Sequence, residues 1–171
     1  MITRTLVLIK PDAVERGLIG KVISRFENRG LKIVGLKLLI AEADTARNHY
    51  GDWVDRYADK LGREKAQSII DEMVKFMTSG PIVAMAVEGV NAVPLVRKIV
   101  GSTYPNEAPV GTIRGDFAHV SQDYANSIGI TIKNIVHASG SDDEAKIEIK
   151  TWFKDDELTD YSVVHEKHTL K

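Results

Sequence analysis

The sequence predicts an α/β (α+β) fold in which helices pack on a four-stranded antiparallel sheet. Four short apolar runs are rich in β-branched residues, which is typical of buried strands. Apolar residues recur every three or four positions in the segments between them, which indicates amphipathic helices. The order is strand, helix, strand, then a long helical region, then strand, helix, strand, helix.

The first half of the chain supplies two strands and two helical regions. Residues 5–10 form the first strand, which ends at Pro11, and the helix that follows ends at Gly30. Residues 31–40 form the second strand, and helix-favouring sequence fills residues 44–77. The residues expected to face the core are Leu18, Ile19, Val22 and Phe26, then Val34, Leu36, Leu38 and Ile40 on one face of the strand, then Ile69, Ile70, Met73, Val74 and Met77.

The second half supplies the other two strands and a long loop. Residues 81–87 form the third strand, and residues 91–100 form a short helix. Residues 102–116 are turn-rich, and loops of this length are usually functional or disordered. Residues 130–136 read as the fourth strand, and residues 141–153 as a helix that buries Ile149, Trp152 and Phe153.

This order of elements predicts the split βαβ, or ferredoxin-like, sandwich, with helices on one face of the sheet. The 171 residues suit one domain, 1–171, because no linker or repeat interrupts them. The tail after Asp155 is polar. We interpret His165 and His168 as part of that tail rather than as a metal pair, because no third ligand is evident.

Composition excludes several classes of protein. The net charge of -1 gives no overall basic field for nucleic acid or an anionic membrane. No apolar run approaches the ~20 residues that span a bilayer. Cysteine is absent, so disulfides and thiol catalysis are excluded. Met1 leads directly into the first strand without a leader, and we expect a cytoplasmic protein.

The most informative segment runs from Asn134 to Ser141. It places His137 at the exit of the apolar run, just before a new helix. Ser141 and Glu144 have the spacing of a capping box. Unpaired N–H groups at a helix start attract anions, so an imidazole beside them indicates phosphate chemistry. A lone histidine after a strand is more often structural, and the rest of the chain has to decide.

Other polar residues strengthen that hypothesis when they are taken together. Lys10 ends the first strand, and Arg114 lies between glycines, where the backbone leaves room for a ligand. Arg97 and Thr103 lie on and just after the short helix. Each is weak evidence alone, because surface lysines and arginines are common.

Taken in order, these stretches resemble the nucleoside diphosphate kinase family over nearly the whole chain. The pair formed by Gly111-Thr-Ile-Arg-Gly-Asp116 and Asn134-x-x-His137 is highly specific. The other matching stretches are Lys10-Pro-Asp12, Arg16-Gly-Leu-Ile-Gly20, His49-Tyr50, Thr78-Ser-Gly-Pro81 and Trp152-Phe153.

The resemblance implies transfer of the γ-phosphate of a nucleoside triphosphate, typically ATP, to a nucleoside diphosphate by a ping-pong mechanism through a phosphohistidine. His137 matches the nucleophile, Glu148 the carboxylate that holds its ring, and Ser139 the serine beside it. Lys10 is expected both in catalysis and in binding. The expected nucleotide contacts are Lys10, Tyr50, Arg97, Thr103, Arg114 and Asn134.

The resemblance also implies the cofactor and the partners. Mg²⁺ would arrive with the nucleotide phosphates, so no metal ligand is assigned in the protein. The partners are ATP, GTP and other nucleoside di- and triphosphates, and further copies of this chain. We expect a homo-oligomer, a hexamer with a tetramer as the alternative. Neither nucleic acid nor membrane is expected as a partner.

The chain departs from the family beside the histidine and around the base. Gly140 stands where the family usually has an aspartate, and Asp142 or Asp143 is a candidate substitute. Residues 51–77 are longer than usual and lack the aromatic segment that stacks on the base, with Tyr57 and Phe76 as candidate replacements. Residues 117–133 are also longer. We expect loose selectivity for the base.

Three alternatives remain open at this stage. The first is a non-catalytic nucleotide-binding regulator with the same fold. The second is a nucleic-acid-binding module, although the strands show no aromatic cluster for stacking on bases. The third is a metal-dependent phosphatase, which would release inorganic phosphate without an acceptor nucleotide.

Overall fold

The computed structural model describes residues 1–164 and 166–169, so His165 of the polar tail lies outside the described residues. Its strands are β1 (Ile2–Ile9), β2 (Lys32–Ile40), β3 (Pro81–Val90) and β4 (Val136–Ala138). Its helices are α1 (Pro11–Glu15), α2 (Ile19–Glu27), α3 (Ala43–Tyr50), α4 (Trp53–Leu61), α5 (Arg63–Met77), α6 (Ala92–Val100), α7 (Ile113–Phe117), α8 (Gln122–Ser127), α9 (Asp142–Trp152) and α10 (Glu166–Thr169), with 3₁₀ turns η1 (Pro105–Glu107) and η2 (Asp155–Glu157).

The four strands form one sheet in the order β2-β3-β1-β4, and every neighbouring pair is antiparallel. The two central strands, β1 and β3, are non-consecutive in the chain, as the split βαβ pattern requires. The predicted ferredoxin-like arrangement is therefore confirmed. Among the described helices, none is long and apolar enough to span a lipid bilayer.

The fourth strand is much shorter than predicted. Residues 130–136 were expected to be extended, but only Val136–Ala138 pair with β1. Two constraints explain the difference. Strand β1 ends at Ile9, and Pro11 begins α1. Residues 130–135 therefore have no strand to pair with. Ile135 has a φ of 73°, which breaks the extended conformation.

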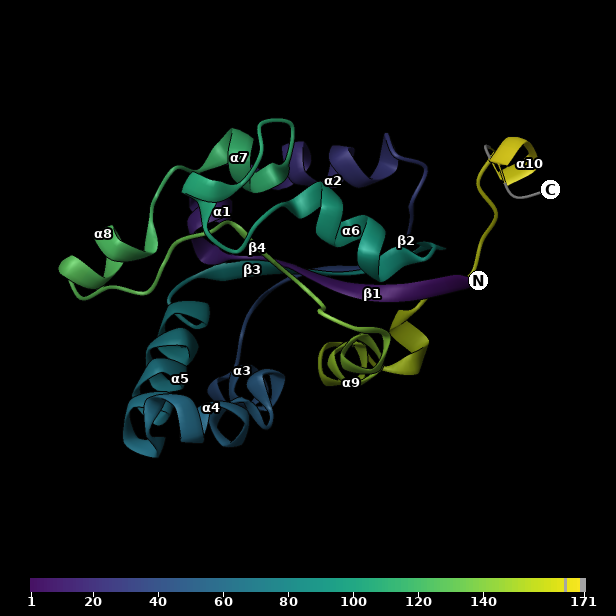
Figure 1. Ribbon diagram of the computed structural model, residues 1–171. Coiled ribbons are helices and arrows are strands. Elements are labelled where there is room, and N and C mark those ends of the chain that lie inside the picture. Colours follow the sequence, from purple (N-terminus) through teal and green to yellow (C-terminus); the bar gives the residue numbers. More distant parts are fainter. Residues whose placement is uncertain (165, 170–171) are drawn as a thin grey trace.

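Helices cover both faces of the sheet, not one face as predicted (Figure 1). In β1, Val7 and Ile9 pack into the core under α2 and α6, while Leu6 and Leu8 pack into the core under α3, α5 and α9. A strand whose consecutive side chains are all apolar has to be buried on both sides. The unbroken apolar run at positions 6–9 was the sequence signal for this second layer.

Strand β2 also differs from its prediction. A bulge at Val34 shifts the register between Ile33 and Gly35, so Val34 is buried while the alternate residues after it are turned away from that core. Those residues are exposed, at 52% for Leu36, 64% for Leu38 and 62% for Ile40. The sheet edge at β2 therefore carries an apolar stripe in the isolated chain.

The helical region of residues 44–77 is divided into three helices. Gly51 and Gly62, both with positive φ, separate α3, α4 and α5. Helices α4 and α5 form a hairpin that projects below the sheet (Figure 1). On α5, Ile70, Val74 and Met77 are buried as expected, and Ile69 and Met73 are partly buried. This hairpin and the segment around α8 extend on the same side of the molecule, beyond the ends of β1 and β4.

Candidate active site

His137 lies in the middle of β4, where it pairs with Leu8 of β1. Its Nε2 lies 3.1 Å from Oε2 of Glu148, which α9 carries across the lower face of the sheet. Ser139 donates its hydroxyl to the same carboxylate oxygen at 2.6 Å. Because a carboxylate accepts hydrogen bonds, Nε2 of His137 carries the proton, and Nδ1 is left with a free lone pair.

The backbone holds this group in place. Ser139 accepts a hydrogen bond from the N–H of Leu6 at 3.1 Å, and its own N–H donates to the Leu6 carbonyl at 3.2 Å. Ser141 caps α9 by accepting from the Glu144 N–H, as predicted. The carboxylate of Glu144 reaches back to the N–H of Gly140 and not to that of Ser141. The turn between His137 and α9 is thus fixed at both ends.

Electrostatics keep His137 neutral. Burial first, and then the nearby positive charges of Lys10 and Arg114, lower the pKa of His137 to about 3. Burial raises the pKa of Glu148 above the usual value of a glutamate. A neutral imidazole with a free lone pair is the form that can attack an electrophile, and this geometry keeps His137 in that form at physiological pH.

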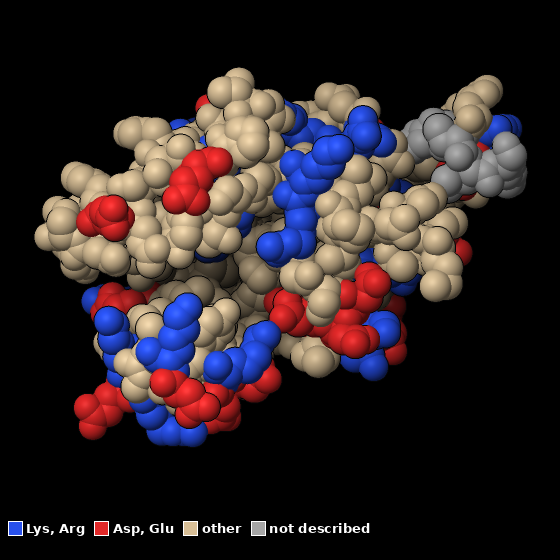
Figure 2. Space-filling view, viewed as in Figure 1, with Lys and Arg blue, Asp and Glu red and all other residues tan. Residues whose placement is uncertain are grey.

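His137 opens into a cleft of about 1490 Å³. One wall is the α4–α5 hairpin, and the other is formed by α6, the loop after it and the segment that follows α8. Figure 2 shows the hollow between these two halves, with lysine and arginine side chains around its mouth. All the residues expected to contact the nucleotide line this cleft: Lys10, Tyr50, Arg97, Thr103, Arg114 and Asn134.

Lys10 and Asn134 form a chain of hydrogen bonds across the floor of the cleft. The ammonium of Lys10 donates to Oδ1 of Asn134 at 2.8 Å, and Nδ2 of Asn134 donates to the Thr103 carbonyl at 2.9 Å. Lys10 is only 8% exposed. Its pKa falls to about 8, chiefly through burial and then through the positive charge of Arg114. The chain joins the end of β1 to the loop after α6.

Arg114 holds the surrounding loops together. Its guanidinium donates to the carbonyls of Asn134 and Val136 on one side, at 3.2 and 2.7 Å. On the other side it donates to the carbonyls of Gly101 and Ser102, both at 3.0 Å. These four bonds leave one of the five N–H groups of an arginine for a ligand. Arg114 therefore cross-links two segments of the chain and also places a positive charge in the cleft.

The remaining predicted residues differ in how freely they project. Arg97 is exposed, and its side chain makes no hydrogen bond or ion pair with the part of the chain that the structure describes. Thr103 is also exposed, while Tyr50 is partly buried with its ring 5.1 Å from that of His49. Arg97 and Thr103 are thus available to a ligand without first breaking internal bonds.

Asp12 and Ile135 form a contact that sequence reasoning missed. Oδ2 of the buried Asp12 accepts the N–H of Ile135 at 3.1 Å, and the Ile135 carbonyl accepts the N–H of Lys10 at 2.8 Å. These two bonds hold a β-branched residue at positive φ, which is strained. The strained residue lies between Asn134 and His137, so it sets the directions in which both side chains point.

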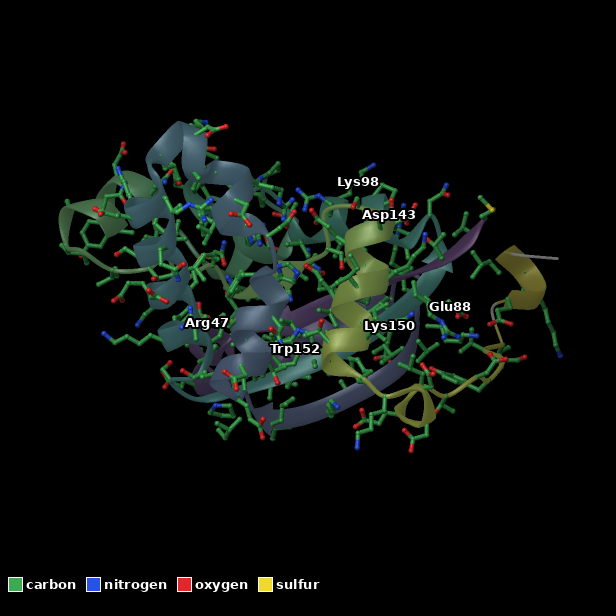
Figure 3. All side chains as sticks on the ribbon, turned by 90° about the horizontal axis from the view of Figure 1, so that it is seen from below. Arg47, Glu88, Lys98, Asp143, Lys150 and Trp152 are labelled. Carbon is green, nitrogen blue, oxygen red and sulfur yellow. The ribbon has the colours of Figure 1, made fainter. Side chains whose placement is uncertain are left out.

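His49 and Trp152 form a second unpredicted contact. The indole N–H of Trp152 donates to Nδ1 of His49 at 3.3 Å. Figure 3 shows Trp152 on the side of α9 that faces α3. The ring of His49 meets the ring of His137 edge to face, with centroids 4.3 Å apart. His49 and Trp152 are 103 residues apart, so no local spacing could have revealed the pair.

The structure also shows where the candidate substitute residues lie, both beside His137 and around the expected base site. Neither Asp142 nor Asp143 lines the cleft, whereas Glu144 does, and it pairs with Arg56 of α4 at 3.0 Å. Of the two candidate base-stacking residues, Tyr57 lines the cleft, stacked on Trp53 at 4.4 Å. Phe76 does not line it. The ammonium of Lys10 lies 6.0 Å from the centroid of the Phe76 ring.

One group of described residues has the composition of a metal site. His49, His137 and Glu148 present donor atoms that all lie within 4.8 Å of one another. Trp152 and Ser139 already donate to two of them, and Lys10 and Arg114 place positive charge beside His137. A divalent cation would meet like charge there, so we assign no metal to this group.

Comparisons with known proteins agree with this geometry. The family model described as nucleoside diphosphate kinase matches residues 3–158. The chain belongs to the nucleoside diphosphate kinase family. Curated relatives with that name include those of Pyrococcus abyssi, 48% identical over 92% of this chain and 88% of the relative, and of Borreliella burgdorferi, 42% identical over 94% and 93%.

Solved structures of this kinase family share the fold. A transition-state mimic of the Borrelia burgdorferi enzyme with bound vanadate and ADP superposes with a TM-score of 0.90, at 40% identity, covering 98% of this chain and 96% of that one. The Halobacterium salinarum enzyme in complex with CDP gives 0.79 at 36% identity, covering 98% of each chain. The chain is accordingly a phosphotransferase that exchanges phosphate between nucleoside tri- and diphosphates.

The depressed pKa of Lys10 predicts a pH dependence for substrate capture. Lys10 is a cation below about pH 8 and loses its charge as the pH rises through that value. We expect kcat/KM, which reports the free enzyme, to fall above about pH 8. The decline in kcat should begin at higher pH, because bound phosphate favours the charged lysine. Steady-state rates across pH measure both.

The matched control is Lys98→Gln, which removes an exposed lysine of α6 outside the cleft and should keep the same decline. A kcat/KM that stays constant from about pH 7 to about pH 9.5 in the wild-type enzyme would contradict the assignment.

Proposed function

We propose that His137 is the nucleophile of this kinase and that it carries the phosphoryl group between two nucleotides. Its Nδ1 lone pair attacks the γ-phosphorus of a nucleoside triphosphate, a P–N bond forms, and the bond to the β,γ-bridging oxygen breaks. The nucleoside diphosphate leaves with that electron pair. The proton on Nε2 stays in its hydrogen bond to Glu148, which stabilises the positive charge that grows on the ring.

The second half of the reaction reverses these steps with a different nucleotide. A terminal phosphate oxygen of a nucleoside diphosphate attacks the phosphorus, the P–N bond breaks, and its electrons return to Nδ1. Each nucleotide uses the same cleft, which makes the kinetics ping-pong. The observation that carries this proposal is the direction of the imidazole: Nε2 is held by Glu148, so Nδ1 is the nitrogen free to attack.

Phosphate charge is matched by positive groups that line the same cleft as His137. Lys10 and Arg114 supply charge from the floor of the cleft, and Arg97 supplies a guanidinium that is free to fork onto phosphate oxygens. Tyr50 and Thr103 offer neutral hydroxyl donors, and Asn134 holds Lys10 in place. Phosphoryl transfer depends mainly on such positioning and charge neutralisation. The first turn of α9 carries Asp142, Asp143 and Glu144, so we do not assign phosphate binding to it.

Mg²⁺ is proposed to enter with the nucleotide. The carboxylates nearest the nucleophile are already engaged, Glu148 by Ser139 and Glu144 by Gly140 and Arg56. This donor set fits an ion held by phosphate oxygens and water rather than by a protein cage. Bound there, the ion would neutralise phosphate charge.

The test of the nucleophile is transfer of label from γ-labelled ATP. Wild-type protein should acquire acid-labile, base-stable label and pass it to GDP in a chase, while His137→Ala should acquire none, because no other group occupies that position. Gel autoradiography and nucleotide chromatography measure the two steps.

His119→Ala is the matched control, since this exposed histidine lies outside the cleft and should label like wild type. Label retained by His137→Ala would disprove the assignment. An unlabelled wild-type protein that still binds ATP would support the regulator, and phosphate released without an acceptor would support the phosphatase.

The outer part of the cleft is proposed to hold the base without selecting it. Leu61, Ile69 and Met73 lie on the α4–α5 wall, and Ile130 and Ile132 lie on the opposite wall. Apolar side chains on both sides can pack on the π-face that every base presents.

We therefore expect the kcat/KM values for ADP, GDP, CDP and UDP to differ by less than about tenfold, which corresponds to about 1.4 kcal/mol. Steady-state rates measured for each diphosphate, with the same nucleoside triphosphate as donor, would give the four kcat/KM values. A preference for one base of about a hundredfold or more would require a specific hydrogen-bonding site and would refute the apolar slot.

We propose that the protein is a homo-oligomer assembled through β2, with the hexamer as the expected state. The tail covers the first part of this edge, where Thr159 and Tyr161 donate to the carbonyls of Val34 and Ile33. Residues 36–40 remain an exposed edge with an apolar stripe, and such an edge is a template for pairing with a second copy. The cytoplasm, where nucleotide pools exchange phosphate, is the proposed compartment.

A charge placed in the stripe should break this contact. Leu38→Glu is expected to sediment as a smaller species than wild type, because a carboxylate would be buried without a partner. Analytical ultracentrifugation measures the change. Ile128→Glu, at the end of α8 and at a residue that is 50% exposed, serves as the control and should leave the mass unchanged. An unchanged mass for Leu38→Glu would exclude β2 as the interface.

A further inference from the structure

Among the residues that the structure describes, His49 is the ring that packs on His137 and that the proposed reaction does not use. Its side chain is only 2% exposed. It lies on the last turn of α3, between Trp152 of α9 and His137 of β4. Three elements far apart in the chain thus converge on this imidazole. A buried polar ring in such a place requires a physical reason.

Trp152 determines which tautomer His49 adopts. An indole N–H is a donor only, so Nδ1 of His49 has to be the acceptor, and the proton of the neutral ring is on Nε2. The bond also occupies the lone pair that would otherwise accept a proton. His49 is therefore a neutral ring with fixed orientation, held by a large buried side chain at 3% exposure.

We propose that His49, held by Trp152, is a positioning residue that fixes the ring plane of His137. The two imidazole planes meet at 88° with centroids 4.3 Å apart, so the ring of His49 stands as a wall against the other ring. This inference rests on the proposed role of His137 as nucleophile. It adds a residue that would act through the orientation of the His137 ring, because its ring packs against that ring and against Tyr50.

The need for a wall follows from the torsion of a histidine side chain. Rotation about χ2 is broad and nearly two-fold, so one hydrogen bond to Glu148 leaves the ring free to rock about that bond. A half-turn would replace Nδ1 by a carbon on the side of the cleft, and it would replace Nε2 by a carbon beside Glu148. A perpendicular ring in van der Waals contact limits both motions.

The groups around His49 favour a positioning role over proton transfer. His49 faces His137 of β4, Lys10 at the end of β1 and Tyr50 of its own helix. It also faces Glu148 of α9, and Oε1 of Glu148 lies 3.9 Å from Nδ1 of His49. Burial first, and then the neighbouring His137 and Lys10, lower the pKa of His49 to about 3. A charge on His49 would repel the charge that grows on His137, so its neutrality suits the transition state.

The decisive measurements are the tautomer of His137 and the rate at which it is phosphorylated. In wild type, ¹⁵N NMR should show His137 protonated at Nε2 alone. His49→Ala should shift these resonances toward an average of tautomers. It should also slow phosphorylation by saturating ATP about 10- to 100-fold, the range expected for a misplaced reacting group. The KM for ATP should change less than about twofold, because the phosphate-binding residues are intact.

Two further variants separate the ring from its hydrogen bond. His49→Gln keeps an acceptor for Trp152 but removes the wall, and should be as slow as His49→Ala. Trp152→Phe keeps the aromatic packing but removes the hydrogen bond that orients the His49 ring. The rate of phosphorylation should be intermediate. Ile70→Ala, in the same core and outside the cleft, controls for lost stability and should keep the wild-type rate and tautomer.

The proposal is overturned if His49→Ala keeps both the wild-type tautomer and the wild-type rate. It is also overturned if Ile70→Ala slows phosphorylation as much as His49→Ala does at equal loss of thermal stability. Neither result bears on the nucleophile, which the His137→Ala labelling decides by itself. The NMR readout is made on unphosphorylated protein, so it reports the ring even if turnover is lost.

Discussion

The active site depends on a ladder of only three residues between β1 and β4. The three pairs are Val7 with Ala138, Leu8 with His137 and Ile9 with Val136. This register places His137 opposite Leu8, in the central pair. The chain on both sides then diverges at once, toward Lys10 and α1 from one strand and toward Ser139 and α9 from the other. His137, the buried ammonium of Lys10 and the helix that carries Glu148 all take their positions from this short contact.

One electrostatic field serves both binding and chemistry. Lys10, Arg97 and Arg114 make the floor and wall of the cleft positive, which attracts a polyphosphate. The same field, together with burial, lowers the pKa of His137 and keeps its lone pair available. Glu148 contacts Nε2 of the same ring, and in the proposed reaction it would stabilise positive charge as that charge develops. The arrangement separates attraction of the substrate from stabilisation of the transition state.

Sequence patterns predicted the parts of the fold that are local. The first three strands follow from apolar runs such as residues 6–9, and the buried face of α9 follows from apolar residues at helical spacing. The predicted site residues all line one cleft. The β-branched run at residues 130–136 was misleading, because extension also requires a partner strand and β1 stops at Ile9. The bulge at Val34 and the His49–Trp152 contact depend on tertiary packing, which periodicity does not report. The single-domain assignment stays a prediction.

Arg114 has a consequence for how this site tolerates change. Four of its N–H groups donate to the carbonyls of Gly101, Ser102, Asn134 and Val136, so the residue that places positive charge in the cleft also joins the segments that line it. A population of random variants screened only for folding would retain Arg114 while losing His137 freely. A descendant of this chain that abandoned catalysis would therefore still present a cationic, nucleotide-shaped cleft, which is the natural starting point for a sensor of nucleotides.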